Sequence, residues 1–122
     1  MSGATPTPAA SAITTHVLDL AKGRPAAGVP IALSVREAAG WRELGRGATD
    51  VDGRLRTLLP AGAPLAPGTY RLVFDTAAYF AADGAESFFP EVSVVFDVKP
   101  GGGHFHVPLL LSPFGYSTYR GS

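Results

Sequence analysis

Hydrophobic and polar positions alternate along most of this chain. The pattern predicts strands at residues 13–18, 31–36, 70–74, 92–98, 104–111 and 115–120. Successive side chains of a β-strand point to opposite faces of a sheet, so a period of two is typical of a half-buried strand. β-Branched and aromatic residues, which favour pleated structure, dominate these runs. The sequence therefore predicts an all-β fold.

Glycine, proline and aspartate separate the predicted strands, at residues 22–25, 52–53, 67–68, 99–103 and 112–113. Pro108 lies inside one strand and has no N–H to donate, so we expect an edge, a bulge or a solvent-facing position there. Only residues 75–82 break the alternation: they are alanine-rich, begin at the capping residue Asp75 and precede Gly84, which predicts a short helix. Short strands at near-regular spacing with one helix predict a sandwich of two sheets.

Composition narrows the classes of function. The chain of 122 residues has no cysteine, which excludes disulfides, thiolate metal sites and a cysteine nucleophile. Its formal net charge is +0, so no general electrostatic attraction to nucleic acid or to an anionic membrane is expected. Residues 1–12 are uncharged, have no apolar stretch and are expected to form a disordered tail before a single domain at residues 13–122. With neither a leader nor a membrane span, a cytoplasmic location is predicted.

Four polar side chains stand in positions that a purely structural strand does not require. His16 and His106 lie within predicted strands, Arg54 begins a short strand after the Asp52-Gly53 turn, and Arg120 lies close to the end of the chain. A single strand histidine is usually a surface or hydrogen-bonded residue, and a single arginine beside a turn is usually solvated. None of the four indicates a site by itself.

His104 and His106 raise the alternative of a metal site. Residues i and i+2 of a strand face the same way, so these two imidazoles with His16 have the composition of a three-histidine zinc site. No carboxylate is placed to orient them, which disfavours this interpretation. The sequence also has no phosphate-binding loop, nucleophile elbow or His-Glu-x-x-His motif.

Four ordered motifs resemble those of the transthyretin-like 5-hydroxyisourate hydrolases. They are Thr14-Thr15-His16-Val17-Leu18-Asp19 with Gly23-Arg24-Pro25-Ala26, then Thr49-Asp50-Val51-Asp52-Gly53-Arg54, then Phe88-Phe89-Pro90-Glu91-Val92, and last His104 to Pro113 with Gly115 to Ser122. The resemblance extends from about Ile13 to Ser122. Four motifs in order, with suitable spacing, are far more specific than any one histidine.

The resemblance implies a fold, an assembly and a reaction. The fold is the transthyretin-like sandwich of two four-stranded sheets with one short helix, assembled as a homotetramer, a dimer of dimers with sites between the dimers. The reaction is hydrolytic opening of the six-membered ring of 5-hydroxyisourate in urate breakdown, without a cofactor. Residues that match the functional positions of the family are His16, Arg54, His106, Tyr119, Arg120, Gly121 and Ser122.

These residue types suit the implied reaction. A neutral imidazole can deprotonate water near neutral pH, and a second can supply a proton to the departing nitrogen. Arginines keep a nearby histidine neutral and stabilise charge on the attacked oxygen. The sequence leaves open how His16 and His106 divide the two roles.

Two other classes of function remain as alternatives. One is a ligand carrier of the same fold, which needs an open apolar channel rather than histidines and arginines. The other is an adhesive or chaperone-like sandwich that uses an exposed strand edge and leaves these polar residues unexplained.

Overall fold

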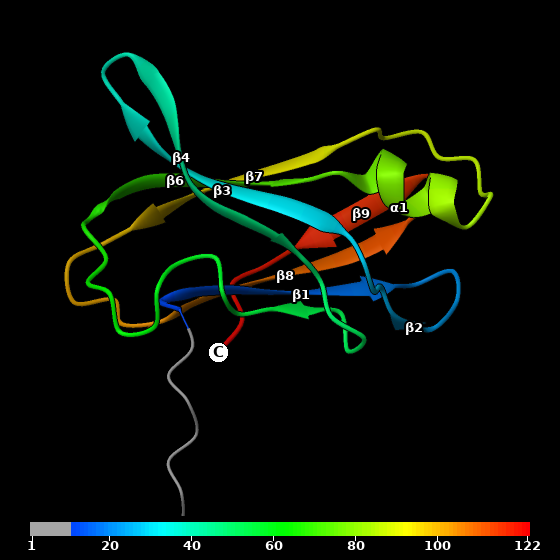
Figure 1. Cartoon of the computed structure of the whole chain (residues 1–122), viewed down its shortest axis with the longest axis horizontal. Coiled ribbons are helices and arrows are strands. Elements are labelled where there is room, and N and C mark those ends of the chain that lie inside the picture. The colour runs from blue at the N-terminus through cyan, green and yellow to red at the C-terminus, as the bar shows by residue number, and fades with distance from the viewer. Residues whose placement is uncertain (1–10) are drawn as a thin grey trace, which may run out of the picture.

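The computed structural model describes residues 11–122. The elements, in chain order, are β1 (Ile13–Asp19), β2 (Arg24–Pro25), β3 (Pro30–Glu37), β4 (Gly40–Ala48), β5 (Arg54–Leu55), β6 (Gly68–Phe74), α1 (Thr76–Ala82), β7 (Val92–Val98), β8 (Phe105–Ser112) and β9 (Gly115–Thr118). They form two sheets that lie face to face, with α1 beside one end (Figure 1). The predicted all-β sandwich with one short helix is confirmed.

The two sheets are ordered β4-β3-β6-β7 and β2-β1-β8-β9. The second sheet contains five strands rather than the expected four, because β5 also pairs with β1. One edge of β1 is fully used by β8, which runs parallel to it, and the other edge is shared by two short strands. β5 pairs at Thr15 and His16, and β2 pairs at Leu18 and Asp19.

Alternating side chains of both sheets fill the space between them. In β1, Ile13, Thr15 and Val17 are fully buried on the inner face, and Leu33, Leu72 and Phe74 of the opposite sheet are equally buried. The residues between them in β1 point to the outer face of the sheet. The inner face supplies the core, so the outer face of β1 is free to carry polar chemistry.

Helix α1 begins and ends as the sequence predicts. The Asp75 carboxylate accepts a hydrogen bond from the Ala78 N–H at 3.0 Å, and Thr76 and Phe80 are buried against the sandwich. Gly84, with φ +68°, follows the last turn. Among the described residues no helix is long and apolar enough to cross a membrane.

Two local features differ from the prediction or refine it. Strand β4 is not among the predicted strands, because its glycines and charged residues hide the strand pattern. Ser11 and Ala12, assigned to the tail, already hydrogen-bond to Arg56 and Phe105, at 3.0 and 2.8 Å. The other tail residues, 1–10, lie outside the described part of the chain.

The prediction at Pro108 was that its strand pairing would be disturbed. Pro108 is in β8, between β1 and β9, but β9 pairs with β8 only as far as Leu109, opposite Thr118. Pairing resumes beyond the proline, where His106 forms a bridge with Gly121. The terminal strand therefore skips the position that has no N–H and then returns to β8 beside a predicted site residue.

Candidate active site

Three strands bring together the residues selected in the sequence. Thr14 and His16 of β1 lie opposite His106 and Pro108 of β8, and His16 also lies opposite Arg54 of β5. Opposite residues in a sheet share a face. His16, Arg54 and His106, which are far apart in the sequence, therefore occupy one patch on the outer face of the sheet.

His106 is held by two neighbours, Thr14 and Gly121. Its Nδ1 lies 2.8 Å from the Thr14 hydroxyl, and its carbonyl accepts a hydrogen bond from the Gly121 N–H at 2.8 Å. A Cβ added at Gly121 would lie 2.7 Å from Cδ2 of the His106 ring, closer than real side chains approach. The ring is thus fixed between a hydroxyl and a bare backbone, and its Nε2 makes no hydrogen bond within residues 11–122.

The surroundings of His106 favour its neutral form. Its pKa lies below the ordinary value of 6.5, first because the ring is partly buried and then because of the positive charge of His104, Arg54, His16 and Arg56. Desolvation and neighbouring cations both disfavour an imidazolium. A neutral His106 with an unoccupied ring nitrogen is suited to accept a proton at neutral pH.

His16 is oriented through a different contact. Its Nε2 lies 2.8 Å from the carbonyl oxygen of Asp52. A carbonyl only accepts, so this nitrogen carries the proton, and Nδ1 is left as the nitrogen able to meet a ligand. The tautomer of His16 is therefore determined by the backbone of the turn before Arg54.

The turn at residues 50–53 places Arg54. The Asp50 carboxylate accepts hydrogen bonds from the N–H groups of Asp52 and Arg54, at 2.9 and 3.0 Å, and these bonds lower its pKa. The carbonyl of Gly53, a residue with φ +76°, accepts a hydrogen bond from the Val17 N–H at 2.7 Å. The half-buried Arg54 side chain makes no hydrogen bond or ion pair to other described residues, so its guanidinium is free to bind a ligand.

The C-terminal tetrapeptide is divided between two places. Gly121 lies against His106, whereas Tyr119 and Arg120 line an apolar hollow of about 220 Å³ beside Phe96 and Phe105. The Arg120 guanidinium lies 4.5 Å from the Phe105 ring centroid and donates to the carbonyls of Gly102 and His104 at 3.3 and 3.4 Å. Within one chain Arg120 therefore contacts the segment before β8 rather than the histidine side chains. Ser122 is exposed.

Sequence reasoning missed one residue of this patch. Thr14 is 4% exposed, and its hydroxyl contacts both His104 and His106. The only available signal was its position two residues before His16 on the same face of the strand. A buried polar residue on an outer face indicates that something covers it, and here the two imidazoles do so.

The metal alternative does not fit this geometry. Among residues 11–122 no group of three histidine, cysteine, aspartate or glutamate side chains is arranged to hold a metal ion. His104 and His106 have ring centroids 6.4 Å apart and share Thr14 as a hydrogen-bonding partner, whereas His16 is bonded to Asp52. The three-histidine zinc site considered from the sequence is not formed.

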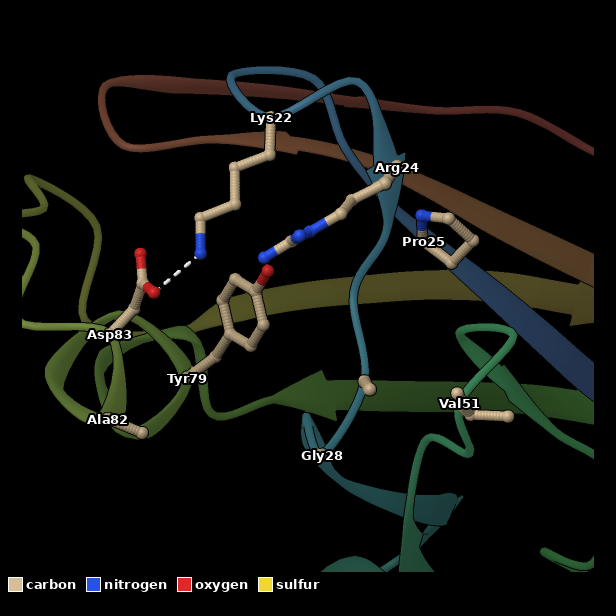
Figure 2. A pocket seen from close by; sticks show the side chains of 9 residues that line it. Lys22, Arg24, Pro25, Gly28, Val51, Tyr79, Ala82 and Asp83 are labelled. Carbon is tan, nitrogen blue, oxygen red and sulfur yellow. Dashed lines mark ion pairs between the residues drawn. The ribbon is translucent and has the colours of Figure 1, made fainter.

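A separate hollow of about 500 Å³ lies between the turn after β1 and helix α1, and none of the predicted site residues lines it (Figure 2). Three of its polar side chains are paired: Lys22 forms an ion pair with Asp83 at 2.5 Å, and the Tyr79 hydroxyl donates to the buried Asp19 at 2.6 Å. These contacts tie the turn after β1 to helix α1.

Comparison with known proteins shows the family to which this chain belongs. A family model described as HIUase/Transthyretin family matches residues 13–121. The chain belongs to this family. It is 51% identical over 114 residues to the mouse 5-hydroxyisourate hydrolase, covering 92% of this chain and 96% of the mouse protein.

Solved structures of the family share the fold. The structure of 5-hydroxyisourate hydrolase from Klebsiella pneumoniae matches with a TM-score of 0.79 and 43% identity, over 90% of this chain and 97% of the other. Sea bream transthyretin in complex with thyroxine matches with a TM-score of 0.83 and 37% identity, over 89% and 93%. Fold similarity alone therefore does not distinguish a hydrolase from a ligand carrier. The distinction depends on the polar patch on the outer face of the sheet.

Proposed function

We propose that this chain hydrolyses 5-hydroxyisourate, opening its six-membered ring in urate breakdown. The observation that carries the proposal is the convergence of His16, Arg54 and His106 on one outer face. The proposal is also supported by the 5-hydroxyisourate hydrolases that resemble this chain over nearly its whole length.

The geometry supports a division of roles that the sequence left open. His106 has a free Nε2 and a lowered pKa, so it deprotonates the attacking water. His16 presents Nδ1, because Nε2–H is committed to the Asp52 carbonyl; once Nδ1 has also taken up a proton from solvent, it delivers that proton to the departing ring nitrogen. Arg54 orients the substrate and stabilises the negative charge that develops on the attacked carbonyl oxygen.

The terminal residues complete the proposed pocket. Gly121 lets the chain lie directly against His106. Tyr119, Arg120 and Ser122 remain predicted binding residues, and the family assembly, with sites between dimers, gives a route by which terminal residues of one chain reach the substrate of another. No cofactor is assigned a part in this scheme.

A homotetramer, a dimer of dimers, is proposed as the active form. β7 ends one sheet and β9 ends the other, and an unpaired strand edge is a template for pairing with a second copy. Exposed Val95 and Tyr116 lie on these edge strands. A cytoplasmic location stays a prediction from the sequence.

The carrier alternative has one observation in its favour, the similarity to a transthyretin that binds thyroxine. A carrier has no use for a histidine whose free nitrogen and lowered pKa suit proton abstraction. The enzyme is therefore the proposal that accounts for the polar patch.

The test is loss of freshly prepared 5-hydroxyisourate, followed by ultraviolet absorbance. We expect acceleration over spontaneous decay, and His106→Gln or Arg54→Gln to reduce kcat/KM by about 100-fold or more with unchanged thermal unfolding. Arg42→Gln is the matched control, because Arg42 is exposed on β4, where it forms an ion pair with Glu37. No acceleration by the parent protein, or normal turnover in either site variant, contradicts the proposal.

A further inference from the structure

A single hydroxyl joins two histidines at the edge of the proposed active site. Thr14 Oγ1 lies 2.8 Å from Nδ1 of His106 and 3.0 Å from Nε2 of His104. The two rings are nearly parallel, 19° apart, on the same side of the strand. Thr14 itself is 4% exposed, so bulk water does not compete effectively for its hydroxyl.

The hydroxyl can satisfy both rings only in a directional way. It has one proton, so it donates to one imidazole and accepts from the other when both rings are neutral. If His106 is to accept a proton at Nε2, its Nδ1 must already carry hydrogen and donate to Thr14. Thr14 then donates to Nε2 of His104. The tautomers of the two histidines are therefore coupled through Thr14.

The two ends of the hydrogen-bonded path His106–Thr14–His104 differ in their exposure to solvent. His106 is half-buried and packs against Gly121, whereas His104 is exposed to solvent just before β8 begins. The Arg120 guanidinium donates to the His104 carbonyl at 3.4 Å, which helps to fix the segment that carries this ring. The hydrogen-bonded chain thus runs from the site to the solvent without an intervening gap.

We propose that Thr14 is a positioning residue that holds the base tautomer of His106 and relays its proton to His104. This inference rests on the proposed hydrolase function, because it assigns how the base of that reaction is prepared and discharged. None of the family motifs as read from the sequence gave Thr14 or His104 a part in the chemistry.

The proton transfers balance along this path. Water loses a proton to Nε2 of His106 as its oxygen forms a bond to the substrate carbonyl carbon. The proton on Nδ1 of His106 passes to Thr14 Oγ1, and the original Thr14 hydroxyl proton passes to Nε2 of His104. His106 ends neutral and His104 ends as an imidazolium, which releases its other ring proton to solvent. The departing ring nitrogen takes its proton from Nδ1 of His16, which has taken it up from solvent. Reverse transfers along the same path restore the starting tautomers: His104 takes a proton from solvent, its Nε2 proton passes to Thr14, the Thr14 proton passes to Nδ1 of His106, and Nε2 of His106 releases its proton to water.

The first experiment separates the hydroxyl from the volume of the side chain. Thr14→Val keeps the β-branched shape and removes the hydroxyl, whereas Thr14→Ser keeps the hydroxyl. We expect Thr14→Val to lower kcat by about 10- to 100-fold with little change in KM, and Thr14→Ser to restore most of the rate. Equal rates for the valine variant and the parent overturn the proposal, as does a serine variant as slow as valine with the parent's thermal stability.

A second substitution tests the relay apart from the positioning. His104→Gln keeps a side chain able to hydrogen-bond Thr14 but removes the group that takes up the proton. We expect kcat to fall several-fold and the buffer concentration to begin to limit the rate, since a small buffer base then has to remove the proton. Turnover equal to that of the parent, with no buffer dependence, overturns the relay.

A third measurement does not depend on catalysis. Nitrogen-15 NMR of ligand-free protein reports which ring nitrogen carries hydrogen. We expect His106 to be protonated mainly at Nδ1 in the parent and in Thr14→Ser, and to lose this preference in Thr14→Val. The opposite tautomer in the parent overturns the inference even if 5-hydroxyisourate is hydrolysed. If the protein shows the expected tautomers but fails the hydrolysis assay, the failed assay overturns the proposed function. The coupling of the two histidines through Thr14 is then still established.

Discussion

At the scale of single residues, the property that matters most is the protonation of His106. Burial and neighbouring cations lower its pKa, and its hydrogen bond to Thr14 uses Nδ1, which leaves Nε2 without a hydrogen-bonding partner among residues 11–122. These surroundings suit the proposed role of His106 as a base.

This gives a pH prediction with a definite sign. Because the folded-state pKa of His106 lies below the ordinary 6.5, the acidic limb of kcat/KM is expected below pH 6.5. Unfolded chains take up the proton at higher pH, so stability is also lost as pH falls from 6.5 toward the folded value. An NMR titration of His106 together with the rate profile measures both effects. A midpoint at or above 6.5 contradicts the prediction, and Arg56→Gln is expected to raise it.

Gly121 provides a second prediction at this scale. A methyl group there would lie 2.7 Å from Cδ2 of His106 and 3.3 Å from Cγ of Pro108. We expect Gly121→Ala to displace the ring and to lower kcat/KM by about 10- to 100-fold, since small misplacements of catalytic groups are costly. Gly115→Ala is the control, because its nearest neighbour would be the Ser112 hydroxyl at 3.7 Å. Equal rates for both variants would show that His106 tolerates the crowding.

At the scale of elements, β5 and the turn before it determine where Arg54 and the Asp52 carbonyl lie. β5 has only two residues, yet it pairs with β1 at His16. The turn is closed by Asp50 and by Gly53, whose backbone packs on β1 beside the Val17 carbonyl.

Gly53 is therefore expected to be more sensitive than other turn glycines. Gly53→Ala introduces a side chain at φ +76° and also crowds the Val17 carbonyl. Gly28→Ala, at φ +78° with open space around it, has the conformational cost alone, about 1 kcal/mol. We expect Gly53→Ala to cost more than ~2 kcal/mol of unfolding free energy in urea and to lower kcat/KM. Similar stability of the two variants would contradict the close packing of this turn on β1.

At the scale of the whole molecule, the two sheets end in β7 and β9, and the proposed tetramer uses these edges. Light scattering coupled to size exclusion is expected to give a mass four times the 12.6 kDa of one chain. Because the sites are proposed to lie between dimers, specific activity should fall when dilution separates the dimers. A monomer with full activity at every concentration excludes this assembly.

Much of this architecture follows directly from the sequence. Alternation predicted β1, β3, β6, β7 and β8, and Asp75 and Gly84 marked the limits of α1, because these signals are local. Alternation did not predict strand β4, because its glycines and charged residues suit an edge strand that another part of the backbone approaches closely. A Cβ at Gly45 would collide with the Leu58 carbonyl. Such an approach depends on a segment distant along the chain, which no local pattern reports.

The sequence by itself determined the types of the proposed catalytic groups, His16, Arg54 and His106, and the alternation that puts the two histidines on strands. Only the tertiary structure decided that these residues share one face, because strand register and the parallel pairing of β1 with β8 are long-range properties. It also decided which nitrogen of each histidine is free, since the partners, Asp52 and Thr14, are brought in by strand pairing. Residue identity supplies the chemistry, and packing selects the proton positions.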